Sequence, residues 1–105
     1  MSNEKIYNLM SDEHLQCAAD TLKVMGHPIR IKMALLLSQG RFSVGELAEL
    51  CGLPPNQTCE HLRLLKRYDL LDSEKEGRTV FYYIDSDRLS GLLECISKNC
   101  PMSTI

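Results

Sequence analysis

The chain has 105 residues, enough for one compact domain and too few for two. Apolar residues make up 44% and charged residues 25% of the chain, which excludes a disordered or low-complexity protein. The formal net charge of −2 excludes wrapping of nucleic acid by bulk positive charge, but it leaves room for a local basic face.

The sequence predicts three parts: a flexible N-terminal arm at 1–10, a folded domain at 11–99 and a C-terminal tail at 100–105. No apolar run is long enough to span a membrane, and no basic segment followed by an apolar stretch marks a secretion signal. We therefore expect a cytoplasmic protein with no membrane partner.

The first two helices follow from apolar spacing and from their end signals. Ser11 suits an N-cap, and apolar residues recur at helical spacing over about 12–25, up to Gly26. Pro28 suits the first turn of a second helix, which ends at Gly40. Because this second helix is apolar nearly all round, we expect it to be central and buried.

Two short helices come next, with a tight turn between them. Ser43 and Glu46 fit a capping box that starts a helix over about 43–51. Gly52 closes that helix, and a fourth helix is expected at about 54–68. The inner stripe of the fourth helix consists of Thr58, Leu62 and Leu65.

The periodicity then changes from helical to extended. Two segments rich in β-forming residues, about 70–75 and 78–84, flank Gly77 and indicate a hairpin. A last helix is expected from the Asp85–Asp87 cap to about Lys98. The predicted fold class is mainly α with a β-hairpin wing: a winged helix-turn-helix domain with five helices.

This order of elements indicates DNA binding. In a helix-turn-helix the second helix enters the major groove, and here the wing at 70–84 is expected beside the backbone. The outer side of the 54–68 helix carries amides and arginines, which read base edges or contact phosphates, whereas Glu60 would repel phosphate. The residues expected at double-stranded DNA are Ser43, Pro55, Asn56, Gln57, Thr58, Glu60, His61, Arg63, Arg67, Lys75 and Arg78.

Four segments, taken in order, resemble an ArsR-type winged-helix transcriptional regulator over roughly residues 15–98. They are LKVMGHPIRI at 22–31, FSVGELA at 42–48, HLRLL at 61–65 and EGRTVFYY at 76–83. The resemblance implies a cytosolic homodimer joined through its first and last helices. It also implies a repressor that leaves an imperfect palindromic operator when it senses a metal, metalloid or thiol signal.

The sequence departs from the family at several positions. Pro54, Pro55 and Cys59 stand where the family often has small polar residues that contact DNA.

The family's usual sensor residues are missing too. Its paired metal-binding cysteines align with Ser43 and Gly45, and no His follows His61 to form its site on the last helix. The second-helix cysteine of its thiol pair aligns near Leu35.

Of the five cysteines, Cys17, Cys95 and Cys100 lie on the first helix and near the chain end, where the implied dimer would bring them together. Three thiolates suit a soft ion such as arsenite, and two can be oxidised. The competing interpretation is that they are small buried or incidental residues, as core packing explains Cys51. No cofactor is expected to be required, and a metalloid or oxidant would enter only as an inducer.

Two other functions compete with transcriptional regulation. A winged-helix module that binds protein and not DNA would account for the acidic residues Glu60, Asp72, Glu74 and Glu76 around the supposed DNA face. A small thiol enzyme has little support, because Cys59 and the nearby His61 point about 200° apart on a helix and cannot form a nucleophile–base pair. We therefore expect no enzymatic activity.

Overall fold

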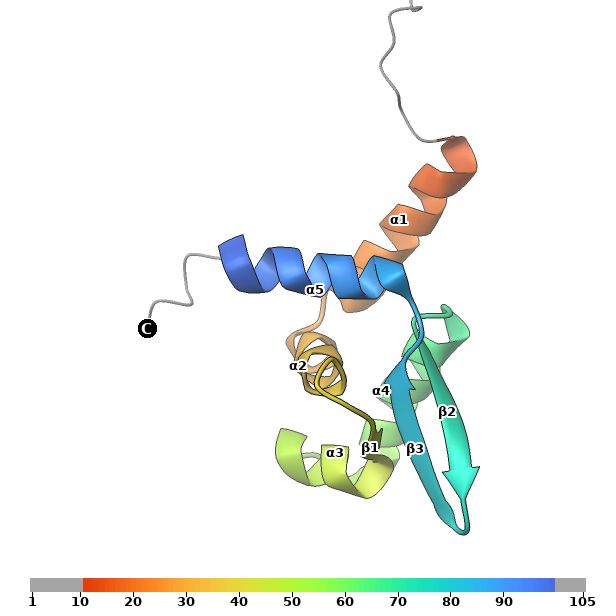
Figure 1. Ribbon diagram of the computed structural model, residues 1–105, viewed down its shortest axis with the longest axis vertical. Helices are drawn as coiled ribbons and strands as arrows, with labels where there is room; N and C mark the ends of the chain where they lie inside the picture. Colours follow the sequence, from red (N-terminus) through yellow and green to blue (C-terminus); the bar gives the residue numbers. More distant parts are fainter. Residues whose placement is uncertain (1–10, 100–105) are drawn as a thin grey trace, which may run out of the picture.

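The structure is a computed structural model that describes residues 11–99; the predicted arm at 1–10, the predicted tail at 100–105 and Cys100 lie outside the described residues. Within the described range the chain forms five helices and three strands (Figure 1). The elements are α1 Asp12–Met25, α2 Pro28–Leu37, β1 Phe42–Ser43, α3 Val44–Cys51, α4 Pro55–Arg67, β2 Leu71–Glu76, β3 Thr79–Ile84 and α5 Asp87–Asn99.

The hairpin is confirmed, and it gains a third strand. The sheet is antiparallel in the order β1-β3-β2, with Phe42 opposite Tyr82 and Ser43 opposite Phe81. The strand β1 was not predicted, because two residues are too few to display a period of two. This short strand fixes the start of α3 to the middle of β3.

The core forms around α2, as its apolar composition predicted. Met33, Ala34 and Leu37 are buried, and α2 lies between α5 and α3 in Figure 1. Leucines from α3, α4, the start of β2 and α5 complete a single aliphatic cluster. The helix-turn-helix and the wing are therefore attached to one common core.

The first helix buries only part of its predicted apolar repeat. Leu15 and Leu22, which belong to that repeat, are 45% and 59% exposed, whereas Thr21 and Val24 are buried. The reason is visible in Figure 1, where only the C-terminal end of α1 reaches the body and the rest projects away from it. None of the helices in residues 11–99 has the length and apolar character needed to cross a membrane.

Candidate nucleic-acid interface

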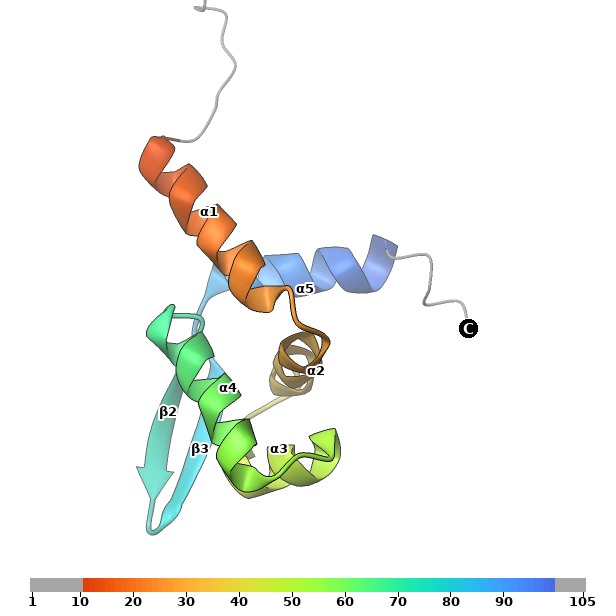
Figure 2. The same cartoon turned by 180° about the vertical axis from the view of Figure 1, so that it is seen from behind.

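The helix α4 is positioned by its buried side. Thr58, Leu62 and Leu65 are each 0% exposed, which confirms the predicted inner stripe. The turn before α4 is set by Gly52, whose φ of 66° lies in the left-handed region that glycine adopts without strain. With its inner side fixed, α4 presents its opposite side to solvent (Figure 2).

That outer side keeps its predicted polar stripe exposed. Asn56 and Gln57 lie in the first turn, and Arg63 and Arg67 follow on the same side. None of the ion pairs found in residues 11–99 includes Arg63 or Arg67. Their guanidinium groups are therefore available to an external anion.

Lys66, on the same helix, is directed elsewhere. Its Nζ donates to Ser73 Oγ at 2.8 Å and lies 3.8 Å from Asp72 Oδ1. Both partners belong to β2, so Lys66 connects α4 to the wing. Of the three cations of α4, Lys66 therefore holds the hairpin, whereas Arg63 and Arg67 face solvent.

Four of the predicted DNA residues line one surface hollow of about 340 Å³. They are Glu60, His61, Arg63 and Arg67, joined by Leu64 and by Arg30 from α2. Arg30 was not among the predicted residues, although an arginine inside the apolar run 28–37 signals a polar partner. Its Nε donates to His61 Nδ1 at 3.2 Å, and its Nη1 donates to the Val24 carbonyl at 3.1 Å.

The environment of His61 favours the neutral imidazole. Partial burial lowers its pKa below the ordinary 6.5, and the nearby Arg30 and His27 lower it further, while Glu60 acts in the opposite direction. The His27 and His61 rings meet edge to face, with centroids 5.0 Å apart. At neutral pH the hollow therefore has three arginines, one carboxylate and an uncharged histidine.

The wing tip brings other predicted residues together. Gly77 turns the hairpin with a φ of 64°, and Lys75 and Arg78 are exposed on either side of it. Arg78 and Ser43 line a second hollow, of about 310 Å³, between the start of α3 and the wing. Ser43 also caps α3: its Oγ accepts from the Glu46 amide at 3.1 Å, and the Glu46 carboxylate accepts from the Ser43 amide at 2.8 Å.

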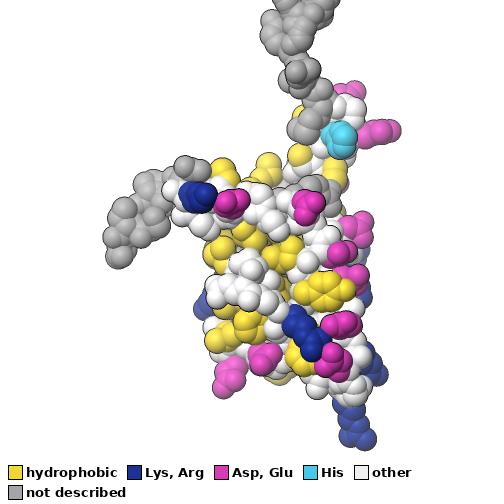
Figure 3. Space-filling view, viewed as in Figure 1, with side chains coloured by type: hydrophobic (Ala, Val, Ile, Leu, Met, Phe, Trp, Pro, Cys, Tyr) yellow, Lys and Arg dark blue, Asp and Glu magenta, His cyan; other side chains and the backbone are white. Residues whose placement is uncertain are grey.

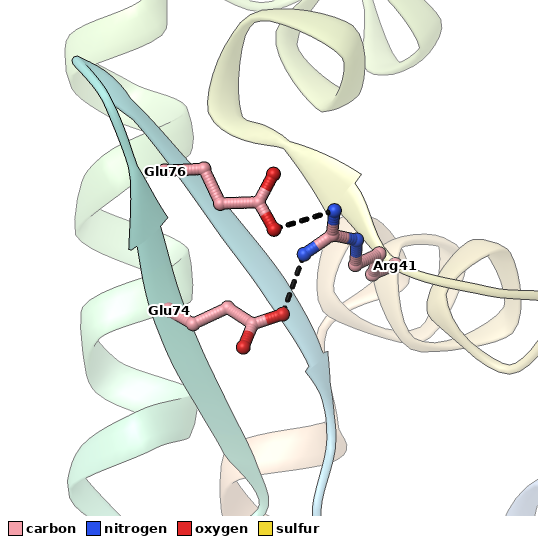
Figure 4. A network of polar contacts seen from close by, with 3 residues as sticks. All are labelled: Arg41, Glu74 and Glu76. Atoms are coloured by element: carbon pink, nitrogen blue, oxygen red, sulfur yellow. Dashed lines mark hydrogen bonds and ion pairs between the residues drawn. The ribbon is translucent and has the colours of Figure 1, made fainter.

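Two acidic residues of the hairpin, Glu74 and Glu76, lie on the side away from α4. Glu74 and Glu76 alternate with Ser73, which Lys66 contacts, so they project from the opposite face of β2. Figure 3 views that face and shows acidic side chains gathered over β2 and β3. There, Arg41 bridges the Glu74 and Glu76 carboxylates (Figure 4) and lies 4.2 Å above the Phe81 ring.

Thr58, which was predicted to contact DNA, lies in the core instead. Thr58 is fully buried, and its hydroxyl donates to the Pro54 carbonyl at 3.1 Å. A side chain in that position has no access to DNA, because it faces the core on the inner stripe of α4. Pro55, at the first position of the helix, is exposed.

The cysteines divide between core and surface. Cys51 packs against the core as predicted, and burial raises the pKa of its thiol, although Lys32 counteracts the rise. Cys17 is half-buried on α1 and Cys95 is exposed on α5. Within residues 11–99, no three His, Cys, Asp or Glu side chains are grouped to hold a metal ion. Cys100, the third cysteine of the predicted trio, lies outside that range.

The chain is similar to known helix-turn-helix transcriptional regulators. A family model described as "Helix-turn-helix domain" matches residues 25–74. The HTH-type transcriptional regulator YgaV of Escherichia coli (strain K12) is 32% identical over 87 residues, which cover 80% of this chain and 87% of that protein. The biofilm growth-associated repressor of Agrobacterium fabrum is 32% identical over 75 residues, but this match spans only 64% of that repressor and 71% of this chain.

A solved structure with the same architecture is that of HlyU from Vibrio cholerae N16961. It superposes with a TM-score of 0.80 at 28% identity, covering 84% of this chain and 96% of that one. The similarity therefore extends beyond the helix-turn-helix to the surrounding helices and the wing.

Proposed function

The chain belongs to the ArsR/SmtB family of winged helix-turn-helix transcriptional regulators, and we propose that it acts as a homodimeric repressor that binds a specific duplex operator. In this proposal α4 enters the major groove, and the wing lies along the backbone. Occupying a promoter in this way blocks transcription, and the protein works in the cytoplasm, where bacterial DNA is found.

The observation that carries the proposal is the outer side of α4. Arg63 and Arg67 are exposed cations without an ion pair in the described part of the chain, while amides at Asn56 and Gln57 precede them. Arginine contacts guanine or phosphate, and amides contact adenine. Of the wing carboxylates that favoured a protein-binding module, Glu74 and Glu76 project from the other face of the sheet and pair with Arg41, and Asp72 Oδ1 lies 3.8 Å from Lys66 Nζ.

The homodimer is supported by α1. Leu15 and Leu22 lie two helical turns apart on one side and are about half exposed. An exposed pair of leucines on a projecting helix suits burial against a second copy. The substitution Leu22→Asp is expected to give a monomer in sedimentation velocity. A Leu22→Asp variant that stays dimeric would show that this side of α1 is not the interface.

The test of DNA binding is a fluorescence anisotropy titration with the duplex upstream of the protein's own gene. Fully reduced protein and excess nonspecific competitor are used. We expect Arg63→Ala to weaken binding by about tenfold or more, because one good base or phosphate contact is worth about 1–3 kcal/mol. Unchanged binding by a folded Arg63→Ala variant would exclude the assigned face.

Lys32→Ala is the matched control. It also removes one exposed cation, but Lys32 is two residues from Arg30 on α2 and points about 200° away from it, away from α4. We expect its affinity to stay within about twofold of the wild type, as for an exposed charge outside the interface. Absence of any duplex binding, with operators elsewhere excluded by selection from genomic fragments, would favour the protein-binding module.

The proposal includes release by a thiol-reactive or metalloid signal. It is supported by Cys17 on α1 and Cys95 on α5, the helices that the proposed dimer brings together. Parallel titrations with arsenite or a mild oxidant test it. Release that disappears in Cys17→Ser or Cys95→Ser would assign the sensor, whereas binding that neither reagent changes would make these cysteines structural.

A further inference from the structure

The contact between Arg30 and His61 joins three helices beneath the proposed DNA face. Arg30 comes from the first turn of α2, His61 from the middle of α4, and the Val24 carbonyl from the end of α1. The partial negative charge at the C-terminus of α1 favours the guanidinium in that place. Arg30 is therefore held in a fixed position from which it meets the ring of His61.

This contact selects one form of the imidazole. A guanidinium is always charged and can only donate, so Nδ1 of His61 must be the acceptor and must lack a proton. The neutral ring then carries its proton on Nε2. The lowered pKa of His61 keeps the ring neutral at physiological pH, and no hydrogen bond from Nε2 is found within residues 11–99.

The ring of His61 also lines the 340 Å³ hollow, which Arg30, Arg63 and Arg67 make cationic despite Glu60. A phosphate oxygen of a DNA backbone suits such a hollow, since it is anionic and accepts hydrogen bonds. A base edge is uncharged and would gain less from three arginines.

Resting on the DNA-binding function proposed above, we propose that Arg30 is a positioning residue of the interface. It holds His61 in the Nε2–H form, and His61 donates that hydrogen bond to a DNA phosphate received beside Arg63 and Arg67. Arg30 thus acts on DNA through His61, and the contact orders a neutral donor beside the charged Arg63 and Arg67.

The first test reads the tautomer in the free, full-length protein. Long-range ¹H–¹⁵N spectra of the histidine rings identify the protonated nitrogen, and we expect Nε2 alone for His61 in the wild type. In Arg30→Met, which cannot donate to Nδ1, we expect a mixture of tautomers and a higher His61 pKa, because a neighbouring cation is lost. A wild-type ring protonated on Nδ1, or no change in Arg30→Met, would overturn the proposal.

The second test uses two isosteres that leave Arg30 in place. The amide oxygen of His61→Asn can replace the Nδ1 acceptor but offers no donor further out, whereas His61→Gln can place an N–H near the position of Nε2. We expect His61→Asn to weaken DNA binding about tenfold, which corresponds to the loss of one hydrogen bond to a charged group. We expect His61→Gln to retain most of the affinity. Equal losses in both would mean a merely structural role and would overturn the proposal.

Two controls separate the outcomes. His14→Asn makes the same change at an exposed histidine on α1 and should leave affinity unchanged. A shuffled duplex distinguishes the ligand: an equal loss on operator and shuffled DNA supports phosphate, while a loss confined to the operator indicates a base and overturns the phosphate assignment. If wild-type protein binds no DNA, the proposed function itself fails, even where the tautomer result stands.

Discussion

The two parts of the proposed DNA surface are held in place by different forces. The helix α4 is fixed from its inner side by Thr58, Leu62 and Leu65, all fully buried. The outer face of the wing is fixed by Arg41, which joins the exposed carboxylates of Glu74 and Glu76. Salt does not screen apolar burial, whereas it does screen exposed ion pairs.

This difference suits two different tasks. A helix that reads base edges must keep its side chains within a fraction of an ångström of their targets, and a close-packed core provides that rigidity. A wing beside the backbone meets a smooth, repetitive charge pattern and tolerates adjustment. We therefore expect perturbations of the core to affect the whole domain and perturbations of the wing to remain local.

The largest effect is expected from Leu62→Ala. Removing a fully buried leucine side chain from α4 leaves a cavity and should lower the free energy of unfolding by about 2–5 kcal/mol. Urea denaturation followed by circular dichroism measures it. The control Leu50→Ala truncates a leucine of α3 that is 48% exposed and should cost much less. Similar losses in the two variants would contradict the claim that α4 is anchored by burial.

The buried side of α4 was also the part that the sequence predicted best. Thr58, Leu62 and Leu65 recur with the helical period, and any helix packed on a core must bury such a stripe. The hairpin was predicted equally well, because Gly77 sits between two β-rich segments.

Contacts between elements distant in sequence were not predicted. Arg30 meets His61 from 31 positions away, and Arg41 meets Glu74 from 33 positions away. No local period encodes which charged residues the fold brings together. For the same reason the apolar repeat of α1 did not reveal that Leu15 and Leu22 are exposed: helical spacing identifies a shared face but not the surface it covers.

An intermediate effect is expected from Gly77→Ala in the wing turn. An alanine at a φ of 64° adopts the left-handed region at a cost of about 1–2 kcal/mol. Hydrogen exchange should show faster opening of the β2–β3 amides, with the amides of α4 unchanged. The control Gly45→Ala replaces an exposed helical glycine and should be neutral or slightly stabilising. Equal acceleration across α4 would mean that the wing and the helix are not separable.

Arg41→Ala should have a smaller effect on stability, because exposed ion pairs contribute little. Its consequence should appear in DNA binding, since two carboxylates then lose their partner and the wing gains local negative charge. The test is affinity as a function of salt, in which the defect should shrink at high ionic strength. The double substitution Glu74→Gln, Glu76→Gln in the Arg41→Ala background should recover affinity, and a failure to do so would contradict an electrostatic cause.

The smallest effect is a pH dependence that belongs to α4 and not to the wing. The pKa of His61 is lowered in the folded protein, chiefly by burial and then by Arg30, so between that value and about 6.5 the unfolded chain binds more protons than the folded one. Stability should therefore fall as the pH drops below about 6.5 and level off below the folded pKa. His61→Gln should flatten this part of the curve of unfolding free energy against pH, and His14→Asn should leave it unchanged. Arg41→Ala leaves His61 and its neighbours in place and should change the salt dependence alone; a pH response that also disappeared in Arg41→Ala would show that the two regions are coupled.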